Sequence, residues 1–118
     1  MASFLRTTIA WAWLSGLLLG CSTSTLYSWG HYEAQIYSSS VTPASMSPEA
    51  QVAQLEQDYQ KARAENKRMP PGFHAQLGYL YFQLGRLDQA RRELETEKTE
   101  FPESAVLVDH LLASLKKL

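Results

Sequence analysis

The sequence has little cysteine, little net charge and no recognisable catalytic motif. Its 118 residues include one cysteine, so no disulfide can form within the chain. Lys and Arg number 11 against 12 Asp and Glu, and the net charge of −1 argues against nucleic acid as a partner. The hydrophobic fraction of 45% excludes a wholly disordered chain. These values indicate one small folded domain.

Residue patterns that carry catalysis are absent from the sequence. It contains no Gly-rich phosphate loop, no Gly-x-Ser-x-Gly elbow and no catalytic pair of carboxylates. The histidines are His31, His74 and His110, and none has a second ligand at the spacing of a metal motif. We therefore predict no enzymatic activity, no metal and no cofactor.

The first 20 residues have the composition of a secretory signal. Arg6 follows the start, and residues 9–19 form an uncharged apolar run of eleven residues. That run is shorter than the roughly 20 residues of a membrane-spanning helix, but it suits the apolar region of a signal peptide. An uncleaved signal anchor is the alternative.

The junction Leu18-Leu19-Gly20-Cys21 resembles the lipobox of bacterial lipoproteins. Leu18 and Gly20 match its aliphatic and small positions, whereas Leu19 departs from the small or polar residue usual there. The resemblance implies cleavage before Cys21 and acylation of Cys21, and several acyl chains hold a protein stably on a membrane. In enterobacterial lipoproteins an Asp after the Cys retains the protein in the inner membrane. Ser22 therefore implies the outer membrane, on its periplasmic face.

Residues 22–37 are unusually aromatic for a tether. Trp29, Tyr32 and Ile36 have the spacing of one helical face, whereas Tyr27 and Trp29 would alternate along a strand, so both structures stay open. The rings can belong to the core, form a protein-binding patch or lie at the membrane interface. Trp29 and Tyr32 are candidate partner-binding residues. Residues 38–47 follow as a predicted polar linker.

Residues 48–118 have the pattern of a helical domain. Ser47 suits an N-cap and Pro48 a first helical position. The apolar spacing predicts helices over residues 48–67, 73–84, 87–100 and 105–116. Gly85 and Pro102 separate the last three. The predicted fold class is all-α, with a signal at 1–20, a lipidated aromatic segment and linker at 21–47, and a helical domain at 48–118.

Residues 71–104 resemble a tetratricopeptide repeat, a helix–turn–helix unit of 34 residues. The matching positions are Leu77-Gly78, Tyr81, Gly85, Ala90, Leu94 and Pro102. His74 replaces the usual Trp and Glu97 a usual Ala, which puts close packing against a following helix in doubt. The resemblance implies a concave surface that binds peptides or helices, lined by the first helix of the hairpin. His74, Tyr79 and Tyr81 are therefore candidate partner-binding residues. An ordinary helical hairpin is the alternative.

The mature sequence also resembles a family of small bacterial lipoproteins of unknown function. LYSWGHYE, PPGFHAQLGYLYFQLGR and EKTEFPESAVLVDHL carry this resemblance. Members of that family occur with lipoproteins related to the curli secretion pore, which implies a role in an envelope assembly. We therefore expect a membrane-tethered adaptor that binds envelope proteins. The alternatives are a structural subunit that docks through residues 27–37 and, less favoured, an enzyme or small-ligand carrier.

Overall fold

The computed structural model describes residues 25–41 and 46–117. Within these residues it contains five α-helices, one 3₁₀ turn and no β-strand, which confirms the all-α class. The elements are α2 (Tyr32–Val41), α3 (Pro48–Ala64), α4 (Phe73–Gln83), α5 (Leu87–Glu100), the 3₁₀ turn η1 (Pro102–Ser104) and α6 (Ala105–Leu115). The predicted signal at 1–20 and the predicted lipidation site, Cys21, lie outside the described residues.

The ends of α3 follow from the residues that flank it. The Ser47 side chain accepts a hydrogen bond from the Ala50 N–H at 3.3 Å, and Pro48 occupies the first turn, as predicted. The helix ends at Ala64 rather than at 67, because Asn66 adopts a left-handed backbone with a φ of 54°. The helices α4 and α6 each end one residue before the predicted position, and α5 has the predicted bounds.

Part of the predicted linker at 38–47 is helical. Residues 38–41 form the last turn of α2, where the hydroxyls of Ser38, Ser39 and Ser40 donate to carbonyls three or four residues earlier. These local bonds satisfy the serine side chains within a helix, so the polar run does not require a loop. The linker prediction is corrected for residues 38–41, and residues 42–45 lie outside the described residues.

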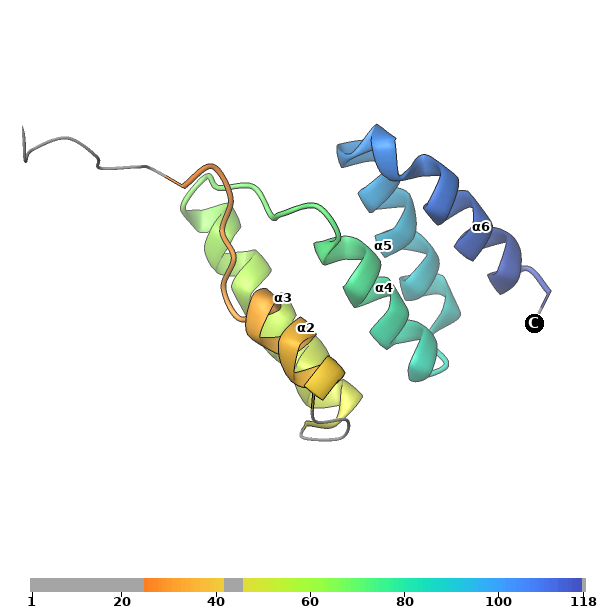
Figure 1. Cartoon of the computed structure of the whole chain (residues 1–118), viewed down its shortest axis with the longest axis horizontal. Coiled ribbons are helices and arrows are strands. Elements are labelled where there is room, and N and C mark those ends of the chain that lie inside the picture. Colours follow the sequence, from red (N-terminus) through yellow and green to blue (C-terminus); the bar gives the residue numbers. More distant parts are fainter. Residues whose placement is uncertain (1–24, 42–45, 118) are drawn as a thin grey trace, which may run out of the picture.

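The helices α4 and α5 form an antiparallel hairpin, with α3 beside α4 and α6 packed against α5 (Figure 1). Gly85 makes the turn between them with a φ of 70°. Gly78 lets the two helices approach closely, since a Cβ there would lie 3.1 Å from the Ala90 carbonyl oxygen and 3.2 Å from Leu94 Cγ. The hairpin therefore depends on a small residue at the point of closest approach.

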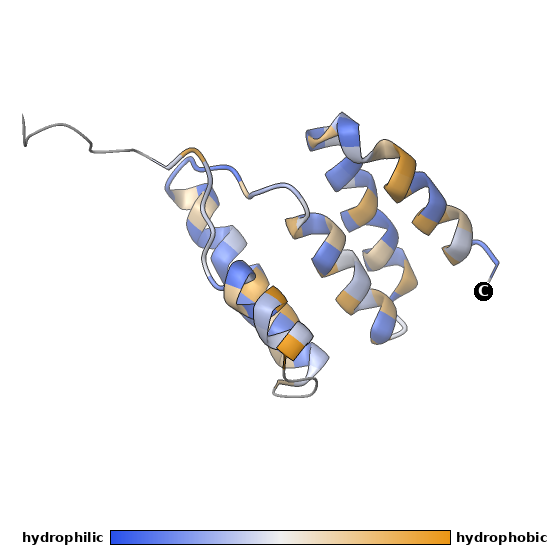
Figure 2. Ribbon diagram, viewed as in Figure 1, coloured by the Kyte–Doolittle hydropathy of each residue, from blue (hydrophilic) through white to orange (hydrophobic). Residues whose placement is uncertain are grey.

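The apolar core lies between the helices, along which apolar and polar residues are interspersed (Figure 2). Phe73, at the start of α4, is completely buried. The rings of Tyr32 from α2 and Tyr59 from α3 contact it at centroid distances of 5.8 and 6.2 Å. Phe73 therefore joins three helices. The other buried apolar residues of this cluster are Val52, Leu55, Ala62, Met69, Leu77, Leu80, Tyr81, Ala90, Leu94, Val108 and Leu115.

The segment before α2 is extended and pairs once with the connection between α3 and α4. The Ser28 N–H donates to the Arg68 carbonyl at 2.8 Å, and Tyr27 and Arg68 form an isolated parallel bridge. The chain then turns at Gly30, with a φ of 47°, and enters α2 at Tyr32. Both conformations that the sequence left open therefore occur, the extended one before Gly30 and the helical one after it.

Two buried carboxylates from neighbouring helices cap the first turns of α2 and α4. Asp58 of α3 accepts the His31 N–H at 2.6 Å, where α2 begins. Glu97 of α5 accepts the Gly72 N–H at 2.6 Å and the Ala75 N–H at 3.3 Å, where α4 begins. Asp58 is 7% exposed and Glu97 is 2% exposed. Negative charge is favoured at a helix N-terminus, so each carboxylate stabilises a helix to which it does not belong.

The substitution Glu97→Ala tests this cap. It leaves two N–H groups at the buried start of α4 without their acceptor, and we expect the free energy of unfolding to fall by about 2 kcal/mol. Glu97→Gln keeps an acceptor oxygen and should recover part of that loss. Urea denaturation followed by circular dichroism measures both variants. An alanine variant as stable as the parent chain would show that Glu97 contributes nothing as a cap.

Candidate functional site

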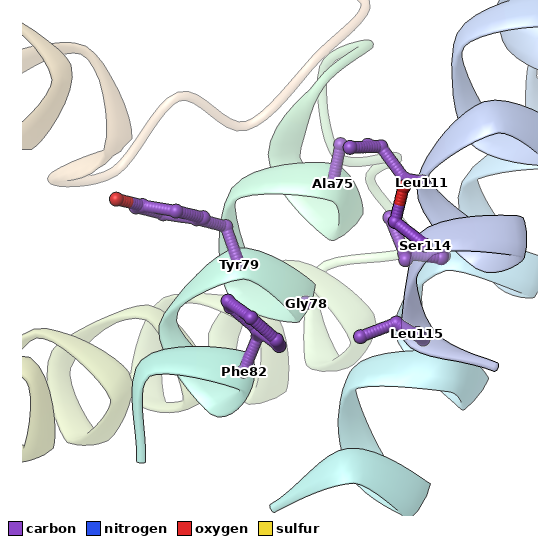
Figure 3. A pocket seen from close by; sticks show the side chains of 8 residues that line it. Ala75, Gly78, Tyr79, Phe82, Leu111, Ser114 and Leu115 are labelled. Atoms are coloured by element: carbon purple, nitrogen blue, oxygen red, sulfur yellow. The ribbon is translucent and has the colours of Figure 1, made fainter. Parts of the chain in front are cut away.

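An apolar groove lies between α4 and α6, beside Leu94 of α5 (Figure 3). Its volume is about 200 Å³. The lining residues are Ala75, Gly78, Tyr79 and Phe82 of α4, Leu94 of α5, and Leu111, Ser114 and Leu115 of α6. Ala75 and Gly78 are small, so over this stretch α4 presents no large side chain to the leucines of α6. The groove is the space left by that difference in side-chain size.

Large apolar side chains form the rim of the groove on both helices. Tyr79 and Phe82 on α4 are 53% and 39% exposed, and Leu111 on α6 is 37% exposed. Contiguous exposed apolar side chains of this kind mark interaction surfaces. Two side chains of the groove wall carry a hydroxyl, and both hydroxyls are hydrogen-bonded: Ser114 donates to the His110 carbonyl at 3.0 Å, and Tyr79 accepts from Gln83 Nε2 at 2.8 Å. The groove therefore favours an apolar occupant.

His74 lies in the interior, on the side of α4 that faces α3 and α5. Its side chain is 2% exposed, and its ring packs edge-on against Tyr59 and Phe73 at centroid distances of 5.3 Å. Its Nδ1 lies 2.7 Å from a Glu93 carboxylate oxygen, and its Nε2 has no hydrogen-bond partner among the described residues. His74 of α4 therefore contacts both α3 and α5. Because it is buried, it is not exposed for binding a partner.

Tyr81 is also an interior residue, with 3% of its surface exposed. Its hydroxyl donates a hydrogen bond to the Glu56 carboxylate on α3. Burial raises the pKa of the Tyr81 hydroxyl well above its ordinary value, and the hydrogen bond and negative charge of Glu56 raise it further. The neutral phenol of Tyr81 links α4 to α3 through this hydrogen bond. Because Tyr81 is buried, it is not exposed for binding a partner. Of the three residues that the sequence selected on α4, Tyr79 alone lines the groove.

Sequence reasoning missed two residues of the rim, Phe82 and Leu111. Phe82 follows Tyr79 by three positions, so helical spacing would have placed both on one face. Leu111 carries no such signal, because it shares its helical spacing with Val108 and Leu115, which are both buried. The packing of α6 on α5 buries Val108 and Leu115 but leaves Leu111 partly exposed.

Most of the residues that line this groove lie in a segment that matches a known family. The family described as Domain of unknown function (DUF4810) matches residues 26–111. The chain belongs to the DUF4810 family. This match confirms membership in a family of unknown function, and it includes Tyr79, Phe82 and Leu111. No curated protein and no solved structure matches the chain.

In the DUF4810 domain the candidate residues Trp29 and Tyr32 have different surroundings. The Tyr32 ring packs on Phe73, and its hydroxyl oxygen would lie 2.6 Å from a Cβ placed on Gly72. Burial raises the pKa of the Tyr32 hydroxyl, and the negative charge of Glu97 adds to this. Trp29 stacks on Tyr32 at a centroid distance of 6.4 Å but is 45% exposed. The segment therefore packs through Tyr32 and presents Trp29 at the surface.

The three histidines of the DUF4810 domain lie in separate surroundings. His31 contacts Asp58 at 3.0 Å, His74 contacts Glu93, and His110 is exposed on α6. Among residues 25–41 and 46–117, no three His, Cys, Asp or Glu side chains are grouped so that they could bind a metal ion. None of the helices formed by those residues has the length and apolar character to cross a bilayer.

Replacing the two aromatic residues separately distinguishes packing from surface exposure. Tyr32→Ala removes a half-buried ring from Phe73 and should lower the free energy of unfolding by about 2–3 kcal/mol. Trp29→Ala removes a more exposed ring and should cost less, about 1 kcal/mol. Chemical denaturation measures both values. A loss for Trp29→Ala as large as that for Tyr32→Ala would contradict the assignment of Trp29 to the surface.

Proposed function

We propose that this DUF4810 protein is a membrane-tethered adaptor of the bacterial cell envelope, which holds an amphipathic helix of a partner protein in the groove between α4 and α6. The observation that carries the proposal is the groove itself, with Tyr79, Phe82 and Leu111 partly exposed along its rim. Amphipathic helices bind in such grooves through apolar side chains spaced three and four residues apart.

The size and chemistry of the groove favour a protein partner over a small molecule. Pockets that enclose small ligands have volumes of about 300–1,000 Å³ and a few placed polar groups. This groove has a volume of about 200 Å³, and its walls are almost entirely apolar. That space suits one or two apolar side chains projecting from a larger chain. The proposal accordingly assigns no catalytic residue and no cofactor.

The position of the groove agrees with the resemblance to a tetratricopeptide repeat. In that repeat the first helix of the hairpin lines the concave binding surface. Here the corresponding helix is α4, and the contact of Gly78 with Ala90 provides the close approach that the repeat spacing requires. Among residues 25–41 and 46–117 the hairpin of α4 and α5 is flanked by α3 on one side and α6 on the other (Figure 1).

The proposed tether is the acylated Cys21, after cleavage of a signal at 1–20. The family match begins five residues after Cys21. A fully extended chain of that length spans at most about 18 Å. Acylation would therefore keep the domain close to the bilayer, and Ser22 supports the periplasmic face of the outer membrane. The partners that the lipoprotein resemblance favours are envelope proteins, including lipoproteins related to the curli secretion pore.

Labelled palmitate tests the tether. In cells that produce the full-length chain, the protein should incorporate palmitate, fractionate with the outer membrane and resist extraction by high salt. Cys21→Ser should lose the label and leave the membrane fraction, since the acyl chains supply the membrane affinity. Unlabelled protein recovered in the soluble fraction would refute the anchor.

Photo-crosslinking tests the groove independently of the anchor. A photoreactive amino acid at position 79 should yield a defined adduct with one envelope protein in intact cells. Leu111→Glu should lower the adduct yield at least tenfold, because it places a charge in an apolar groove. Leu111 is 37% exposed, so this substitution should leave the helical content unchanged.

The matched control is a photoreactive residue at position 37. Tyr37 on α2 is 70% exposed and does not line the groove, so it should give no adduct with the same protein. The same control tests a second candidate function, in which the protein docks through residues 27–37. Exposure of Trp29 and Tyr37 favours that alternative. An adduct at position 37 that Leu111→Glu does not affect would support it over the groove.

A further inference from the structure

The outer side of α6 exposes apolar residues that the groove does not use. Val106 is 86% exposed and Leu107 is 59% exposed, both near the start of the helix. Val106 does not line the groove between α4 and α6. Because each residue rotates the helix by about 100°, Val106, His110 and Ala113 lie on one side. All three are exposed.

The acidic side chain of α6 is paired with a lysine of α5. The acidic residue within the helix, Asp109, turns toward α5, where the Lys98 ammonium contacts its carboxylate at 2.5 Å. Asp109 remains 57% exposed in this pair, whereas Val106, His110 and Ala113 carry neither a carboxylate nor an ammonium group. Val106, His110 and Ala113 therefore form a partly apolar strip along successive turns of α6, and such a strip suits contact with another helix.

Opposite charges stand at the two ends of the strip. Glu103 lies in the turn before α6 and Lys117 follows it, and both side chains are exposed. Glu103, Val106, His110, Ala113 and Lys117 are spaced by three, four, three and four residues, which is the seam spacing of paired helices. His110 is the midpoint of this series.

These features make the strip complementary to itself in an antiparallel arrangement. A second α6 running the opposite way would place its Lys117 against Glu103, and its Ala113 against Val106. Each large side chain then meets a small one, and each charge meets its opposite. The midpoint residue, His110, would meet its counterpart on the other copy. A pairing of this kind is an isologous contact with twofold symmetry.

We infer that the outer side of α6 binds a second copy of this chain, antiparallel and centred on His110. One pair of short helices buries less surface than a standard stable interface. The dimer is therefore weak, and tethering to one membrane would favour it by raising the local concentration. The groove residues Tyr79 and Phe82 lie on α4, outside this contact.

Cysteine crosslinking of the full-length chain in intact cells tests the inference. In His110→Cys, the two new thiols meet at the symmetry axis, and mild oxidation should give a disulfide-linked species of twice the chain mass. The matched control is Thr99→Cys, an exposed residue on α5. That variant, and the parent chain with Cys21 alone, should remain monomeric. A monomeric His110→Cys variant would overturn the inference, as would equal crosslinking of Thr99→Cys.

Charge exchange tests the antiparallel direction. Glu103→Lys or Lys117→Glu, each combined with His110→Cys, places like charges opposite each other and should lower the crosslinked fraction by about threefold or more. The double exchange restores opposite charges and should recover the parental fraction. If the double exchange does not recover the crosslinked fraction, the antiparallel pairing is overturned.

A crosslinked product heavier than the chain but not of twice its mass would show that another protein covers the strip, and this would also overturn the inference. The groove crosslink at position 79 reports on the partner separately, so the two proposals can fail independently.

Discussion

The Glu97 carboxylate makes the contact that sets how α4 lies on α5, and α3 and α6 pack on the hairpin that these two helices form. Gly72, the N-cap residue of α4, offers no side chain to its own helix, so Glu97 of α5 supplies the acceptor for the first N–H groups. Gly72 is held there with a φ of 90°, and the Tyr32 hydroxyl occupies the space where a Cβ would stand. One carboxylate thus fixes α4 on α5 at a point that α2 also contacts.

The groove is a consequence of how α5 supports its two neighbours. Glu97 and the close approach at Gly78 hold α4 on one side of α5, while the packing of the buried Val108 holds α6 on the other. Because both helices are positioned through α5, their facing surfaces do not have to close on each other. The small residues of α4 then leave an apolar space that a partner side chain can enter.

The two positions that depart from the repeat pattern, His74 and Glu97, are both polar residues in the interior. Their partners lie on other helices: His74 contacts Glu93, and Glu97 accepts N–H groups of the first turn of α4. Buried polar groups of this kind are costly unless they are hydrogen-bonded, so they specify one arrangement of helices. The departure at Glu97 therefore does not prevent close packing, since α6 packs on α5 beside it.

The sequence by itself determined the all-α class, the four helices after Ser47 and the hairpin turn at Gly85, because capping, apolar periodicity and glycine conformation act over a few neighbouring residues. It also selected Tyr79 and Trp29, which are exposed. It did not separate them from His74 and Tyr81, which are buried, since burial depends on α3 and α5, distant in sequence. The caps from Asp58 and Glu97 and the exposure of Leu111 were decided by tertiary structure alone. Each of them depends on how one helix lies against another. Local residue patterns do not encode the relative positions of helices that are distant in sequence.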